Sequence, residues 1–147
     1  MSLYSGIRIV LADDDADDRE LFSEAVSAIS SDIILNIVED GMQLMTMLNA
    51  GHTIVPTIIF IDLNMPGKNG KNCLKEIRDN EKLKHIPVII YSTSSNPKDI
   101  DEIYKMGASF YICKPNTFVG IIEITRKVIL LDWNKYKPEI SARDSIF

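Results

Sequence analysis

The feature of this sequence that most limits its fold is a regular alternation of short apolar runs with segments of helical spacing. The apolar runs are residues 7–12, 34–38, 57–61, 87–92 and 110–113. The third and fourth are nearly continuous Ile and Val with Phe or Tyr, which is typical of central strands covered on both faces of a parallel sheet. Strand alternating with helix predicts a doubly wound α/β fold with strand order 2-1-3-4-5 and helices on both faces.

The segments between the apolar runs carry apolar residues at helical spacing. The expected core-facing positions are Leu21, Phe22, Ala25, Val26 and Ile29, then Leu44, Met45 and Leu48, then Leu74 and Ile77, and finally Ile100, Ile103 and Tyr104. Such stripes indicate helices packed on the sheet rather than cofactor sites. Gly107 follows the stretch DIDEIYKM and predicts the end of a helix.

Composition narrows the possible functions. A chain of 147 residues predicts one domain, which we place at 1–133, followed by a tail at 134–147. The net charge of -5 disfavours nucleic-acid binding, and no apolar run approaches the roughly 20 residues of a membrane helix. Cys73 and Cys113 have neither CxxC nor zinc spacing, so we expect two buried thiols and a reduced, cytoplasmic setting. The stretch MSLYSGIRIV does not resemble a signal peptide.

Polar residues follow the strands at the points where they end. The run DDDADD follows the first strand, Asp62 follows the third, Ser92 ends the fourth, and Lys114 follows the fifth. The carboxyl ends of parallel strands meet at one edge, where ligands bind in doubly wound sheets. We therefore expect three carboxylates, a hydroxyl and an ammonium group in one crevice.

Clustered carboxylates require either protonation or a cation. Two of them 4 Å apart near a protein surface repel by about 4 kcal/mol, and Mg²⁺ prefers carboxylate, water and phosphate oxygens. Asp13, Asp14 and Asp62 carry three negative charges, which Mg²⁺ and Lys114 would balance. Such a site could accept a phosphoryl group on Asp62, because carboxylates form acyl-phosphates and the transfer depends mainly on positioning and charge neutralisation.

Each of these residues also has an ordinary reading when it is taken alone. An Asp after a strand is often a helix N-cap or a turn residue, and a Lys or Ser in a loop is usually solvated. The triplet leaves the register open, but strand length favours Asp13 and Asp14 as the acidic pair with Asp15 as the cap. What favours a shared site is that the residues converge on one sheet edge.

The chain resembles a response-regulator receiver domain, the family that includes the chemotaxis response regulator, over about residues 7 to 131. The matching motifs are the acidic pair, DLNMPGKNG, YSTSS and YICKPN, in that order at the expected strand ends. The resemblance implies a flavodoxin-like fold and a set of residue roles. These are Asp62 as phosphoacceptor, Asp13, Asp14, Asp62 and the Asn64 backbone carbonyl as Mg²⁺ ligands, Lys114 and Ser92 as catalytic groups, and Ser92 with Tyr111 as the switch pair. In this family the bond equivalent to Lys114–Pro115 is often cis.

The resemblance further implies a two-component response regulator that is phosphorylated by a sensor histidine kinase or a histidine phosphotransfer protein. A protein of this kind accepts a phosphoryl group and can release it by hydrolysis, without being a dedicated enzyme. The alternatives are an aspartate-nucleophile phosphatase, which needs a second Asp where Asn64 stands, and a flavin binder, whose phosphate an acidic loop would repel. Thr93, which is larger than the usual Ala or Gly, predicts an acyl-phosphate that lasts at least minutes.

The last helical segment, TFVGIIEITRKVILLDW, has more apolar residues than one core face needs. Ile121, Ile122, Val128 and Ile129 are expected to face the core, and Ile124 with Leu131 to widen the stripe. Two explanations stay open: a homodimer or partner surface on the fourth helix, fifth strand and fifth helix, or cover by Trp133 folded back.

Overall fold

The computed structural model describes residues 2–51 and 55–135, and in this part of the chain the predicted alternation is confirmed. The strands are β1 (Arg8–Ala12), β2 (Ile34–Val38), β3 (Ile58–Ile61), β4 (Val88–Ser92) and β5 (Phe110–Cys113). The helices are α1 (Ala16–Ile29), α2 (Gly41–Leu48), α3 (Gly70–Asp79), α4 (Pro97–Lys105) and α5 (Phe118–Leu130). The strands pair in parallel in the order β2-β1-β3-β4-β5, as the sequence predicts.

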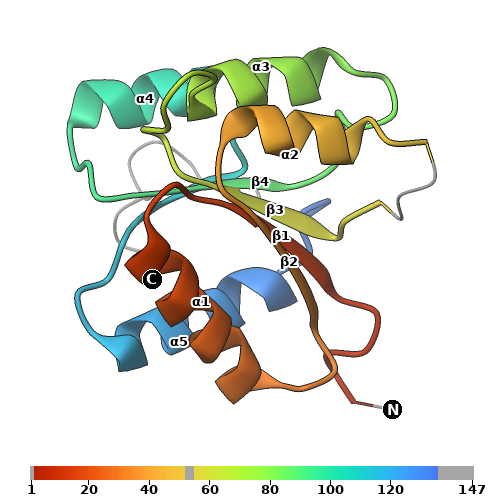
Figure 1. Cartoon of the computed structure of the whole chain (residues 1–147), viewed down its shortest axis with the longest axis vertical. Helices are drawn as coiled ribbons and strands as arrows, with labels where there is room; N and C mark the ends of the chain where they lie inside the picture. Colours follow the sequence, from red (N-terminus) through yellow and green to blue (C-terminus); the bar gives the residue numbers. More distant parts are fainter. Residues whose placement is uncertain (1, 52–54, 136–147) are drawn as a thin grey trace.

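The sheet lies between two layers of helices (Figure 1). Helices α2, α3 and α4 cover one face, and α1 and α5 cover the other. Successive side chains of a strand point to opposite faces, so Ile59 and Ile61 join the core under α2 and α3, while Phe60 joins the core under α1 and α5. Every residue of β3 and β4 is buried, which explains their unbroken apolar sequences.

An aromatic cluster anchors α1 to the sheet. The Phe22 ring lies edge-on to Phe60, with 5.1 Å between the centroids, and to Tyr91, with 5.6 Å. Phe22 and Phe60 are fully buried. This contact fixes the position of α1, whose first turn follows the acidic run.

Side-chain caps set where the helices begin. Asp15 caps α1 by accepting a hydrogen bond from the Asp18 amide, which confirms the register in which Asp15 is the cap and Asp13 and Asp14 are left for other contacts. Asn69 caps α3 in the same way. Gly107 ends the fourth helical segment at φ +104, a conformation that glycine adopts at little cost.

Two burial predictions are wrong, those for Cys113 and Leu21. Cys73 is buried as expected, but Cys113 is exposed, because it is the last residue of the edge strand β5. Leu21 is 39% exposed, since the buried face of α1 is the one that carries Phe22, Ala25 and Val26.

Of the two explanations for the apolar surplus of α5, cover by Trp133 is observed, and the partner surface stays a prediction. Trp133 folds back: its ring lies 6.2 Å from that of Phe110, and its indole N–H donates to the Val128 carbonyl at 3.0 Å. Phe118 and Val119, at the start of α5, stay 40% and 61% exposed. Trp133 therefore covers apolar surface at the end of α5 but leaves Phe118 and Val119 uncovered at its beginning.

None of the helices in the described ranges has the length and apolar character needed to span a membrane. The predicted tail, 134–147, lies outside the described residues from residue 136 onward.

Candidate functional site

Backbone hydrogen bonds between neighbouring strands continue past the strand ends and hold the site residues in place. The Asp13 amide donates to the Val38 carbonyl at 3.2 Å, the Asp62 amide to the Ala12 carbonyl at 2.9 Å, and the Lys114 amide to the Ser92 carbonyl at 2.8 Å. Each side chain thus leaves a rigid backbone at the same edge of the sheet, as the strand order predicts.

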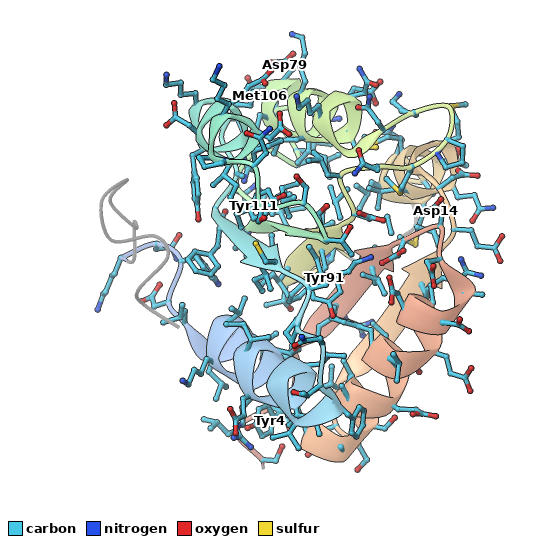
Figure 2. All side chains as sticks on the ribbon, turned by 90° about the vertical axis from the view of Figure 1, so that its left-hand side faces the viewer. Tyr4, Asp14, Asp79, Tyr91, Met106 and Tyr111 are labelled. Carbon is cyan, nitrogen blue, oxygen red and sulfur yellow. The ribbon has the colours of Figure 1, made fainter. Side chains whose placement is uncertain are left out.

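Three carboxylates meet at this edge. Asp13, Asp14 and Asp62 each offer an oxygen, and these atoms lie within 4.8 Å of one another. Asp13 and Asp62 are buried and Asp14 is exposed, so the cluster opens to solvent on the side of Asp14, at the start of α1 (Figure 2). The Asp15 amide donates to Asp13 Oδ1 at 3.0 Å and fixes the orientation of that carboxylate.

Lys114 brings the expected positive charge, but it has one partner that the sequence analysis missed. Its Nζ lies 2.8 Å from Asp13 Oδ2, 3.5 Å from Asp62 Oδ2 and 2.7 Å from Asp18 Oδ2. From the sequence alone, Asp18 is simply an acidic residue in the first turn of a helix, where it favours the helix dipole. The one available signal was its helical position one turn after Asp14, on a helix that starts at the site.

The additional carboxylate corrects the charge count made from the sequence. With Asp18 included, four carboxylates surround the site instead of three. A divalent cation and Lys114 would therefore leave one negative charge in place of neutrality. The excess is partly screened by solvent, since the Asp18 side chain is 32% exposed.

The pKa of Asp62 is raised from 3.8 to about 6, first because burial penalises the charged carboxylate. Lys114 opposes this rise, while Asp13 and Asp14 add to it by repulsion. Burial alone would lower the pKa of Lys114, but its contacts with Asp13 and Asp18 outweigh that cost and raise it. The site thus holds a firmly charged lysine beside a buried carboxylate whose charged form is penalised by burial and by its acidic neighbours.

The residues present fit a hard divalent cation. Asp13 Oδ2 is fully buried and accepts no hydrogen bond of normal geometry from the described residues, although Lys114 Nζ lies 2.8 Å away. The donors are all carboxylate oxygens, which suit Mg²⁺ or Mn²⁺ rather than softer metals. Asn64 is exposed two residues after Asp62, and its amide faces Asp62 Oδ1 at 3.4 Å; the role of its carbonyl as a metal ligand stays a prediction.

The two residues expected to form the switch lie beside this site. Ser92 is fully buried at the end of β4. Tyr111 is also buried, and its hydroxyl donates to the Ser94 carbonyl at 2.8 Å, so its ring is already inside in this structure. Figure 2 shows Tyr111 toward α4 and Tyr91 on the opposite face of the sheet.

The loop that follows Asp62 is held by a close backbone approach at Gly70. The Gly70 amide donates to the Leu63 carbonyl at 3.0 Å, and a Cβ on Gly70 would lie 2.6 Å from the Asp62 carbonyl oxygen. Only glycine fits this approach without displacing the acceptor strand. The Lys114–Pro115 bond is trans, contrary to the frequent family pattern, since the described residues contain no cis peptide.

Sequence comparisons show which known family and which known proteins this chain is similar to. A family model described as the response regulator receiver domain matches residues 9–126. The response regulator Rcp1 of Synechocystis sp. (strain ATCC 27184 / PCC 6803 / Kazusa) is 30% identical over 124 residues, which cover 82% of this chain and 84% of Rcp1.

Solved structures of response regulators are also similar to this chain. The phosphorylated cyanobacterial phytochrome response regulator RcpA aligns with a TM-score of 0.77 and 32% identity, over 83% of this chain and 90% of RcpA. The Mn²⁺-bound form of Rcp1 aligns with a TM-score of 0.76 and 27% identity, over 90% of this chain and 99% of that one.

Proposed function

The chain belongs to the response-regulator receiver family of two-component signalling proteins, and from that premise we propose that it receives a phosphoryl group on Asp62. The donor would be a sensor histidine kinase or a histidine phosphotransfer protein. The observation that carries the proposal is the meeting of Asp13, Asp14, Asp62 and Lys114 at one sheet edge, with Asp62 rigidly held.

In the proposed reaction a carboxylate oxygen of Asp62 attacks the phosphorus of a phosphohistidine. An O–P bond forms, the N–P bond breaks, and the histidine nitrogen leaves with the electron pair and takes up a proton. Lys114 and Ser92 would bind the phosphoryl oxygens and neutralise charge during the transfer, which requires positioning more than covalent chemistry. The pKa of Asp62 is raised first by burial of its carboxylate and then by repulsion from Asp13 and Asp14, and Lys114 opposes the rise.

Mg²⁺ would be held by Asp13, Asp14, Asp62 and the backbone carbonyl of Asn64, and when bound it supplies positive charge to the phosphoryl oxygens. The Mn²⁺-bound form of Rcp1 supports a divalent cation in this family. A nearby cation would also favour the ionised, nucleophilic form of Asp62.

We propose that Ser92 and Tyr111 pass the phosphorylation state to the face made by α4, β5 and α5. The buried Tyr111 ring and its hydrogen bond to Ser94 connect the site to β5 and to the loop before α4. Phe118 and Val119, which are exposed in the first turn of α5, would supply apolar area for a partner or for a second copy of the chain. Sedimentation with and without beryllofluoride tests the homodimer, which a monomer under both conditions would contradict.

Intact-mass spectrometry tests the phosphoryl transfer. The protein is incubated with acetyl phosphate and Mg²⁺, and one added phosphoryl group is expected. The same treatment of Asp62→Asn, or of the wild type in excess EDTA, should add none. An unchanged mass of the wild type, or an equal gain by Asp62→Asn, would refute the assignment.

The phosphatase alternative has no support at the residue that it requires. Such enzymes place a general acid two residues after the nucleophile, where this chain has the amide Asn64. Sustained turnover of p-nitrophenyl phosphate, abolished by Asp62→Asn, would restore that alternative and show a dedicated enzyme instead of a signalling module.

A further inference from the structure

We propose that Asp18 is a positioning residue that competes with the phosphoryl group for Lys114 and so sets how readily the site is occupied. The inference rests on the proposed function. It concerns a carboxylate outside the three that meet at the metal position.

The contact between Asp18 and Lys114 joins α1 to the end of β5 across 96 positions of sequence. Among the contacts of the ammonium group, the one to Asp18 is 2.7 Å long and the one to Asp62 is 3.5 Å. The ammonium also lies 5.5 Å from the centre of the Tyr91 ring, which belongs to the core beneath α1 and α5. Lys114 is therefore drawn toward the α1 side of the site and away from the acceptor.

Asp18 is fixed strongly enough to hold the lysine there. Its backbone amide donates to the N-cap Asp15 at 3.0 Å, and the Phe22 ring one turn later is fully buried against Phe60 and Tyr91. The Lys114 side chain is only 8% exposed, so its charge is more weakly screened than that of a surface lysine.

Phosphorylation gives the Lys114 ammonium group a further anionic partner beside Asp18. A phosphoryl group on Asp62 presents new anionic oxygens to the same ammonium group. The lysine can approach them only by loosening its contact with Asp18 or by leaving that carboxylate close to the new charge. Asp18 therefore opposes occupation of the site, and removing its charge should strengthen binding of a phosphoryl mimic.

The neighbouring Asp17 provides a matched control. Both residues lie in the first turn of α1, so Asp17→Asn and Asp18→Asn remove the same formal charge from the same end of the helix dipole. Asp17 is exposed, whereas Asp18 contacts Lys114. A difference between the two variants therefore measures the contact and not the overall charge.

The test is a titration with beryllofluoride in saturating Mg²⁺, with the bound species followed by ¹⁹F NMR. We expect Asp18→Asn to bind beryllofluoride about fivefold more tightly than wild type, the ratio that corresponds to loss of one partly exposed ion pair. Asp17→Asn should change affinity by less than about twofold at 0.5 M salt, because long-range charge effects are screened there. Asp18→Glu, which retains a carboxylate, should restore wild-type affinity.

Two further measurements distinguish a failure of this inference from a failure of the proposed function. Asp18→Ser removes the carboxylate with a different side chain, so the result does not depend on the folding of one variant. The affinity for Mg²⁺ alone is measured on the same variants, and the saturating Mg²⁺ of the titration keeps any difference in metal binding out of the comparison. Equal beryllofluoride affinities of Asp17→Asn, Asp18→Asn and Asp18→Ser would overturn the inference, whereas failure of wild type and Asp17→Asn to bind beryllofluoride would overturn the proposed function itself.

Discussion

Replacing Asp62 by Asn should stabilise the metal-free protein, even though it removes the residue on which the proposed function depends. The carboxylate is buried at the end of β3 and lies near Asp13 and Asp14. Its pKa of about 6, against an ordinary value of 3.8, shows that the folded state holds the proton more tightly than the unfolded chain does.

The sign and size of the effect follow from this shift. A carboxylate with a raised pKa contributes stability that is fully present below about pH 4 and is lost as the pH rises through about 6. A difference of about two pKa units corresponds to at most about 3 kcal/mol, at about 1.4 kcal/mol per unit. This free energy already includes the favourable contact with Lys114, because that contact is one of the causes that set the pKa of Asp62. An uncharged Asn avoids the cost at every pH.

Urea unfolding followed by circular dichroism in EDTA measures the difference. Wild type and Asp62→Asn should have similar free energies of unfolding near pH 4, and the variant should be more stable by about 2–3 kcal/mol near pH 7.5. Excess Mg²⁺ should then stabilise wild type more than the variant, since the cation binds the folded acidic site. A variant that is less stable than wild type near pH 7.5 in EDTA would refute the electrostatic account of the site.

Two other substitutions test the surroundings of the acceptor. Gly70→Ala should lower the free energy of unfolding by about 1–3 kcal/mol, because its Cβ would lie 2.6 Å from the Asp62 carbonyl oxygen; an unchanged urea midpoint would contradict the close approach. Thr93→Ala should shorten the life of the acyl-phosphate, which we expect to last at least minutes in wild type, because the smaller side chain admits water. Mass spectra taken over time after removal of acetyl phosphate measure both proteins, and a wild-type lifetime of seconds would contradict the expectation.

The fold was predictable because its signals are local and repeated. Burial on both faces makes β3 and β4 continuous apolar runs, and the alternation with helices leaves few topologies. Strand ends were less predictable, as Cys113 shows: Phe110, Tyr111 and Ile112 of β5 are buried, and only the last residue of the strand is exposed. The inward position of Tyr111 likewise depends on the Ser94 carbonyl, which the sequence does not place.

The sequence by itself determined that Asp13, Asp14, Asp62, Ser92 and Lys114 would share one sheet edge, because parallel strands in this order end side by side. Only the tertiary structure decided which of these groups touch one another. Lys114 has three carboxylates within reach and lies closest to Asp18, a residue that the pattern of strand ends does not include. The physical reason is that strand order follows from periodic burial, whereas the path of one ammonium group depends on the packing of α1 against the sheet through Phe22.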